Sequence, residues 1–164
     1  ALAEKARMFA GHGALKKHHH EFEGINSRLD GLQAAILSVK LKYINEWTSL
    51  RIQHATAYNK LLSDIECITV PVTHSDAKHV FHLYVIRTEN RNELQNHLNE
   101  NGISSGIHYP TSLPYLKAYG YLGHQSGDYP VAFQYSHEIL SLPMYPELNN
   151  TFIKTITDQI SEYS

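Results

Sequence analysis

Hydrophobic residues recur at helical spacing over the longest patterned part of the chain. A first stripe, with steps of three and four residues, contains Leu29, Leu32, Ile36, Val39 and Tyr43. The stripe drifts near Asn45, after which a second one contains Trp47, Leu50, His54, Tyr58, Leu61 and Ile65. The pattern therefore predicts two helices, or one bent helix, between Leu29 and about Ile65, with a natural boundary near Asn45.

Shorter patterns predict a small α/β layer beside this helical stretch. A helix is expected over residues 2–10, ending near Gly11 and Gly13. Short strands are expected over 68–70, 80–86 and 103–107, and the second is the richest in β-branched and aromatic residues. Further helices are expected from a capping box at 90–93 to 101–102, from 128–130 to 139, and from 149–150 to about 160. Trp47 and His82 are expected in the core.

Composition and charge argue against several functions. The chain has 164 residues, of which 42% are hydrophobic, and this suffices for one modest core. Its net charge is −2 and it contains no basic tract, which argues against nucleic-acid binding. No hydrophobic run approaches the about 18 residues that span a bilayer, and no signal peptide is visible. We therefore expect a cytoplasmic protein without membrane contact.

Neither the cysteine nor the histidines form a pattern typical of a metal site. Cys67 is the only cysteine, which excludes an internal disulfide and fits a reducing cytosol, and we expect it to be a small buried residue. His18, His19 and His20 are adjacent and do not share one helix or strand face, whereas zinc sites use spaced ligands. We expect no metal, and we assign these histidines to a solvated or subunit-contact loop over 13–23.

Candidate chemistry centres on Asn26, Ser27 and Arg28, which the pattern places at or just before a helix start. Unpaired N–H groups and the positive end of the helix dipole favour anions there. An amide donor beside a forked guanidinium suits a phosphate. The residues alone leave a simpler interpretation open, in which Asn26 or Ser27 caps the helix and Arg28 is a solvated residue of its first turn.

Five segments resemble, in order, the motifs of one enzyme family. Residues 24–37 (GINSRLDGLQAAIL) are similar to the signature G-x-N-x-R-L/M-D-x-L/I-Q-A-A-I/L-L of the DegT/DnrJ/EryC1/StrS family. Residues 3–13, 79–86, 102–110 and 140–146 are similar to further motifs of that family. Together the five segments extend over nearly the whole chain, so the resemblance is specific even though each motif alone is modest.

The resemblance implies a sugar aminotransferase that depends on pyridoxal 5'-phosphate and has the α/β fold of aspartate aminotransferase (fold type I). Residues 1–45 would form the end of the large cofactor-binding domain and the interdomain helix, and residues 46–164 the small C-terminal α/β domain. The complete enzyme would transfer an amino group from an amino acid, usually glutamate in this family, to a nucleotide-linked keto-deoxysugar. It would act as a homodimer with shared active sites.

The Schiff-base lysine of the family has no counterpart in this chain. None of the nine lysines stands in the family's Ser-x-x-x-x-Lys context ahead of a Gly-rich turn. We therefore expect that lysine upstream of Ala1, and we expect the chain alone to be inactive. Two alternatives stay open. In one branch of the family a histidine replaces the lysine and the enzyme acts as a sugar dehydratase; the other alternative is a non-catalytic dimerisation or regulatory module.

The resemblance also implies roles for four residues. Asn26 would reach the cofactor phosphate of the partner subunit. Arg28 would contact phosphate or the sugar nucleotide, or would brace the subunit interface. His108 and Tyr109 follow a predicted strand in a loop rich in small polar residues, and they would hydrogen-bond the sugar or the diphosphate. In the competing interpretation, Tyr109 packs against the protein and His108 caps a local carbonyl.

Overall fold

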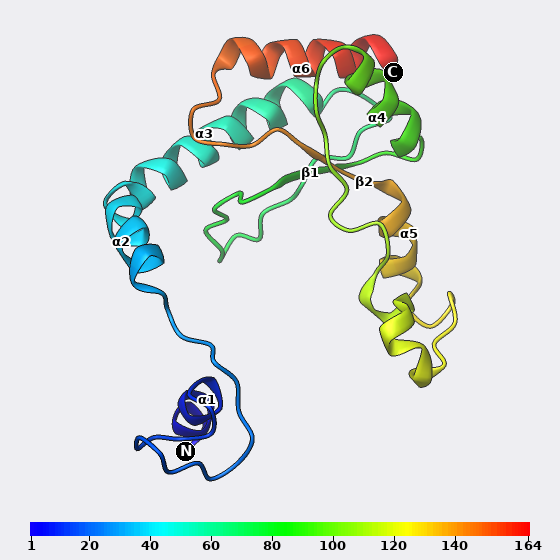
Figure 1. Ribbon diagram of the computed structural model, residues 1–164. Helices are drawn as coiled ribbons and strands as arrows, with labels where there is room; N and C mark the ends of the chain where they lie inside the picture. The colour runs from blue at the N-terminus through cyan, green and yellow to red at the C-terminus, as the bar shows by residue number, and fades with distance from the viewer. The chain divides into compact units, whose positions relative to one another are not determined.

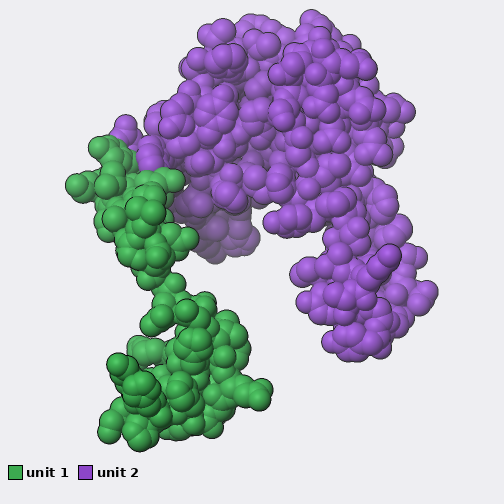
Figure 2. All heavy atoms as spheres, in the orientation of Figure 1, with its two compact units in different colours: residues 1–44 green, residues 45–164 purple.

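The computed structural model describes residues 1–164, which divide into two compact units, Ala1–Ile44 and Asn45–Ser164 (Figure 2). The long helical stretch is two α-helices, α2 (Gly31–Lys40) and α3 (Ile44–Leu62), joined by a 3-10 turn, η1 (Leu41–Tyr43). The predicted break is therefore present, at the place where the hydrophobic stripe drifts. The assignment of residues 1–45 to the large domain of a longer enzyme stays a prediction.

The N-terminal unit begins with α1 (Leu2–Ala10), as predicted, and its following loop folds back on that helix. The last carbonyls of a helix have no partner inside it. Here the backbone N–H of Ile25 donates to the carbonyl of Phe9 (2.8 Å), and that of Ser27 donates to the carbonyl of Ala10 (2.9 Å). Residues 25–27 are thereby held in an extended conformation beside the end of α1.

Helix α2 has no buried residue, although it is strongly apolar. Leu32, Ile36, Leu37 and Val39 are all exposed, and they lie on more than one side of the helix. A helix that is apolar on all sides is normally enclosed by other structure. The exposed apolar surface of α2 is therefore one that is normally buried by packing against other structure.

The C-terminal unit contains a short antiparallel sheet of β1 (Tyr84–Arg87) and β2 (Ile139–Leu142), in which Tyr84 pairs with Leu142 and Arg87 with Ile139. Single bridges extend it on both sides, Thr69 to Arg87 and Gly106 to Ser141. The strands predicted over 68–70 and 103–107 are therefore only bridges. Strand β2 was not predicted, because its four residues follow a helix directly with no turn residue between.

Helices α3, α4 (Arg91–Glu100) and α6 (Asn150–Tyr163) supply most of the core that packs against these strands (Figure 1). The largest fully buried side chains of this core are Tyr58, Leu62, Tyr84, Ile86, Leu94, Leu98, Leu140, Ile153 and Ile160. The rings of Tyr58 and Tyr84 stack with centroids 4.7 Å apart. Their hydroxyls donate to the carbonyl of Pro143 (3.0 Å) and to Oδ1 of Asn59 (2.6 Å). Burial raises the pKa of both tyrosines above the ordinary value of 10.0.

Helix termini agree with the sequence in part. Asn149 caps α6 by accepting from the backbone N–H of Phe152 (2.9 Å), and α5 (Pro130–Glu138) begins at its proline, both as predicted. The capping box expected at 90–93 is absent, since the Asn90 side chain makes no capping bond. Two 3-10 segments, η2 (Leu113–Tyr115) and η3 (Lys117–Leu122), were not predicted.

Three residues expected in the core are not buried. His82 is exposed because Phe81 has a positive φ of 47°, so the chain turns sharply there and β1 begins only at Tyr84. Cys67 is exposed, in the turn after α3, and Trp47 is half-buried. No helix in residues 1–164 has the length and apolar character needed to span a bilayer.

Candidate functional site

The structure changes the local setting of Asn26, Ser27 and Arg28. Helix α2 begins at Gly31, and its cap is Asp30, whose Oδ1 accepts from the backbone N–H groups of Leu32 (2.8 Å) and Gln33 (3.2 Å). Asn26, Ser27 and Arg28 therefore stand just before the helix start and not at it, because the Asp30 carboxylate takes the cap position. The interpretation of Asn26 or Ser27 as the helix cap fails for the same reason.

Asn26 is fixed by the end of α1 instead. Its backbone forms an antiparallel bridge with Gly11, between the hydrogen bonds that Ile25 and Ser27 make to α1. Oδ1 of its side chain accepts from Nε of Arg28 at 3.0 Å. The oxygen is therefore occupied by the guanidinium, and the Nδ2 amide group is left as a donor. Such an arrangement presents a neutral amide donor and a cation on one short extended segment.

A basic cavity of about 620 Å³ lies beside this segment, within the N-terminal unit. Its lining includes Arg7, Lys16, Lys17 and Arg28, together with three histidines, and contains no Asp or Glu. None of these four cations takes part in a salt bridge of the chain. Unpaired cations that line one cavity attract an anion, and the fork of an arginine suits phosphate oxygens.

Sequence reasoning missed this cavity, although it carried a signal. Lys16 and Lys17 precede the three consecutive histidines, within the run that the sequence assigns to a solvated or subunit-contact loop. The loop returns to α1 because Gly13 adopts a positive φ of 76° and packs against the carbonyl of Phe22, where no side chain fits. Residues far apart in the sequence, Arg7 and Arg28, thus line the same space as the two lysines.

The nine lysines are all exposed. A lysine that forms a Schiff base usually has its pKa lowered by burial or by a neighbouring cation. None of the nine lysines is buried in this way. His, Cys, Asp and Glu side chains are also not grouped in a way that would hold a metal ion.

The predicted His108 loop lies in the C-terminal unit. Nδ1 of His108 is 2.9 Å from Oγ of Ser141, which is on β2. The Tyr109 side chain is 72% exposed, and its ring meets the His108 ring edge-on at 5.6 Å between centroids. The competing interpretation of this loop does not hold in the chain as described, because Tyr109 is not packed away and His108 bonds a hydroxyl rather than a carbonyl.

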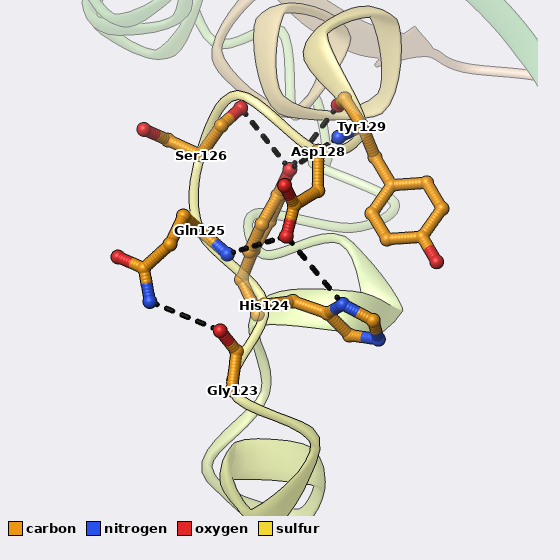
Figure 3. A network of polar contacts seen from close by, with 7 residues as sticks. Gly123, His124, Gln125, Ser126, Asp128 and Tyr129 are labelled. Carbon is orange, nitrogen blue, oxygen red and sulfur yellow. Dashed lines mark hydrogen bonds and ion pairs between the residues drawn. The ribbon is translucent and has the colours of Figure 1, made fainter.

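Tyr109 stands at the rim of an apolar cavity of about 740 Å³ between the 109–116 segment and α5. The segment that follows is ordered by a network around Asp128, shown in Figure 3. Oδ2 of Asp128 accepts from the backbone N–H of Gln125 (2.9 Å) and lies 3.6 Å from Nδ1 of His124. The Tyr115 hydroxyl accepts from the backbone N–H of Tyr129 (3.2 Å) and shares its one proton between the carbonyls of Ser126 and Tyr129, both at 3.2 Å. The segment that follows the Tyr109 loop is therefore held by side-chain hydrogen bonds between residues 115 and 129.

Comparison with known proteins places the chain in a family. Residues 1–161 match the DegT/DnrJ/EryC1/StrS aminotransferase family. The chain belongs to this family. The family predicted from the five motifs is thereby confirmed.

Individual relatives agree with this membership. The chain is 44% identical over 149 residues to the erythromycin biosynthesis sensory transduction protein EryC1 of Saccharopolyspora erythraea, covering 91% of the chain and 41% of that protein. It is 36% identical over 163 residues to dTDP-3-amino-3,4,6-trideoxy-alpha-D-glucose transaminase of Streptomyces venezuelae, covering 99% of the chain and 43% of that protein. The chain thus spans less than half the length of these relatives.

A solved structure confirms the expected fold. The crystal structure of S. venezuelae DesV in complex with a ketimine intermediate is 36% identical and superimposes with a TM-score of 0.93, over 99% of this chain and 44% of that one. A DegT/DnrJ/EryC1/StrS aminotransferase from Brucella abortus, 32% identical, gives 0.87 over 99% of the chain and 43% of that structure. The α/β fold of this aminotransferase family is therefore the fold of the chain.

Proposed function

We propose that the chain is the C-terminal part of a pyridoxal-phosphate-dependent aminotransferase that aminates a nucleotide-linked keto-deoxysugar. The observation that carries the proposal is the basic cavity beside Asn26, because its four unpaired cations suit the phosphate groups that both the cofactor and a sugar nucleotide contain. Relatives with the names of dTDP-sugar and UDP-sugar transaminases support the same substrate class.

The residues of the N-terminal unit fit the phosphate end of pyridoxal phosphate. The amide of Asn26 keeps its N–H donors free while its oxygen is held by Arg28. When bound, the cofactor supplies an aldehyde and an electron-accepting ring, through which an amino group passes from donor to keto sugar. In this proposal Asn26 donates to the phosphate, Arg28 orients the amide and adds positive charge, and the Schiff-base lysine lies in a preceding part of a longer protein.

His108 and Tyr109 are proposed to bind the sugar nucleotide. The Tyr109 hydroxyl and Nε2 of His108 make no hydrogen bond within the chain, so both are available to a ligand. A phenol and an imidazole donate well to hydroxyl and diphosphate oxygens. We further propose that the enzyme is a cytoplasmic homodimer and that Asn26 serves the active site of the partner subunit, with an amino acid, glutamate first among them, as the donor.

Subunit complementation tests the proposal directly. One full-length variant lacks the Schiff-base lysine, and a second carries Asn26→Asp, which places a carboxylate against phosphate and is expected to abolish tight cofactor binding. In a mixed dimer one site then carries both lesions and the other carries neither. Two inactive preparations should regain activity after subunit exchange, up to half the wild-type value per mixed dimer.

A matched control makes the same chemical change elsewhere. Asn99→Asp alters an exposed asparagine of α4 in the C-terminal unit, and it should leave cofactor content and activity at wild-type values. If exchange is verified and no activity returns, then Asn26 does not act across a subunit boundary. If Asn26→Asp retains its full cofactor content, the proposed role of Asn26 is wrong.

A regulatory role is the second candidate, and the names of two relatives favour it. Besides EryC1, a "Pleiotropic regulatory protein" of Geobacillus stearothermophilus is 40% identical over 164 residues, covering 99% of this chain and 44% of that protein. A purely regulatory protein would catalyse no amino transfer, whether or not it binds the cofactor. Measuring the cofactor content and the donor half-reaction of the full-length protein distinguishes the two candidates.

A further inference from the structure

Ser141 has a buried hydroxyl with a single partner. The residue lies in the middle of β2, is 4% exposed, and exchanges two backbone hydrogen bonds with Gly106 (2.7 and 3.0 Å). The only hydrogen bond of its side chain is the one to Nδ1 of His108 at 2.9 Å. Serine is uncommon at a fully buried strand position unless its hydroxyl is used. In this structure the Ser141 hydroxyl is used to hydrogen-bond the His108 ring.

Gly106 provides the space that this contact needs. A Cβ built on Gly106 would lie 2.8 Å from Cε1 of His108, closer than real Cβ atoms approach other atoms. The backbone of Gly106 is not in the left-handed region, so the glycine is required for space rather than for its conformation. The imidazole therefore rests on the Gly106 backbone while the Ser141 hydroxyl holds its Nδ1.

We propose that Ser141 is a positioning residue for substrate binding, which turns His108 so that Nε2 faces the sugar nucleotide as a hydrogen-bond donor. A hydroxyl both donates and accepts, so it pairs with Nδ1 in the imidazolium and in the neutral tautomer that carries its proton on Nε2. In both forms Nε2–H is left to donate to an oxygen of the ligand. This inference rests on the proposed binding of the sugar nucleotide by His108.

Removing the Ser141 hydroxyl should change the orientation of the His108 ring without changing the fold of the loop. The two backbone bonds between Gly106 and Ser141 anchor the loop, and they persist when the hydroxyl is removed. Ser141→Ala leaves no unsatisfied hydroxyl in the core, and His108 itself is an exposed residue. The variant is therefore expected to fold with a thermal midpoint close to that of the wild type.

A double-mutant cycle in the full-length enzyme tests the inference. The measured quantities are KM for the sugar nucleotide and the rate of the half-reaction with the amino donor. Ser141→Ala should raise KM about fivefold, which corresponds to about 1 kcal/mol at 1.4 kcal/mol per tenfold, with the donor half-reaction unchanged. In a His108→Ala background the same substitution should have no further effect. Ser141→Thr, which keeps the hydroxyl, should restore KM toward the wild-type value when the folded state is retained.

The possible outcomes distinguish the inference from the function on which it rests. If His108→Ala raises KM and Ser141→Ala does not, Ser141 does not position the ring and the inference is overturned while His108 stays a binding residue. An equal effect of Ser141→Ala in both backgrounds also overturns it, because Ser141 then acts independently of His108. If His108→Ala leaves KM unchanged, the proposed role of His108 is wrong and the inference falls with it, whereas the Asn26 complementation still tests the aminotransferase function.

Discussion

Replacing Gly106 by alanine should impair substrate binding without unfolding the protein. The added methyl would lie 2.8 Å from Cε1 of His108, whereas ordinary van der Waals contact begins at 3.4 Å. The ring therefore has to move by about 0.6 Å or more. A displacement of that size along the bond stretches the 2.9 Å contact from Nδ1 to Ser141 to the limit of hydrogen bonding.

The expected magnitude follows from that one bond. A typical intramolecular hydrogen bond contributes about 1 kcal/mol, which corresponds to about a fivefold change in an equilibrium constant. We expect KM for the sugar nucleotide to rise about fivefold or more, because the displaced ring also moves Nε2 away from the position in which it is proposed to donate to the ligand. The backbone of Gly106 accepts alanine, so the protein should stay folded, and the free energy of unfolding should fall by about 1 to 3 kcal/mol because the buried Ser141 hydroxyl loses its partner.

Steady-state kinetics with varied sugar nucleotide, alongside urea unfolding of the same preparations, would measure both quantities. The matched control is Gly120→Ala, because a Cβ on Gly120 meets no atom within 4 Å and its φ is not positive. This control should match the wild type in KM. Wild-type kinetics for Gly106→Ala, or equal damage to both half-reactions, would refute the reasoning that ring position limits substrate binding.

Two further predictions concern charge and burial. Replacing Lys16 and Lys17 together by alanine removes two cations of the basic cavity, so KM for the sugar nucleotide should rise about tenfold and should depend less on salt concentration. The control Lys60→Ala, on α3, should change neither KM nor its salt dependence in the same series. Burial raises the pKa of Tyr58 and Tyr84, so the unfolded chain releases these protons at lower pH than the folded chain does. The free energy of unfolding should therefore fall above pH 10 by up to about 1.4 kcal/mol per pH unit for each tyrosine, and urea titrations of Tyr58→Phe should show a smaller slope.

Sequence reasoning succeeded where the determining contacts are local. The periodicity of α1, α2 and α3 predicted those helices, and Asn149 and Pro130 marked the starts of α6 and α5. The five motifs identified the family, since their order and spacing carry more information than any single one. The roles of Asn26, Arg28, His108 and Tyr109 stay predictions.

The missed features depend on residues that are distant in the sequence. Strand β2 forms because β1 and Gly106 pair with its two edges, and four residues alone give no periodic signal. The basic cavity needs the return of the loop to α1, and the partner of His108 lies 33 residues away on another strand. The hydrophobic stripe begins at Leu29, one residue before the actual cap Asp30, so periodicity alone places the start of α2 too early.

The uncovered surface of α2 has a consequence for how activity would emerge during synthesis. A ten-residue helix is marginal in water by itself and gains its stability from packing. Asn26 and Arg28 stand only a few residues before this helix, so the segment that the end of α1 holds at Asn26 leads directly into a helix that needs to be covered. A newly made polypeptide would then hold the proposed anion-binding segment from the α1 side alone until the surface of α2 is covered. Under the proposed function, retention of the cofactor would indicate that α2 is covered. A free chain with α2 uncovered would expose an apolar helix that chaperones and proteases recognise.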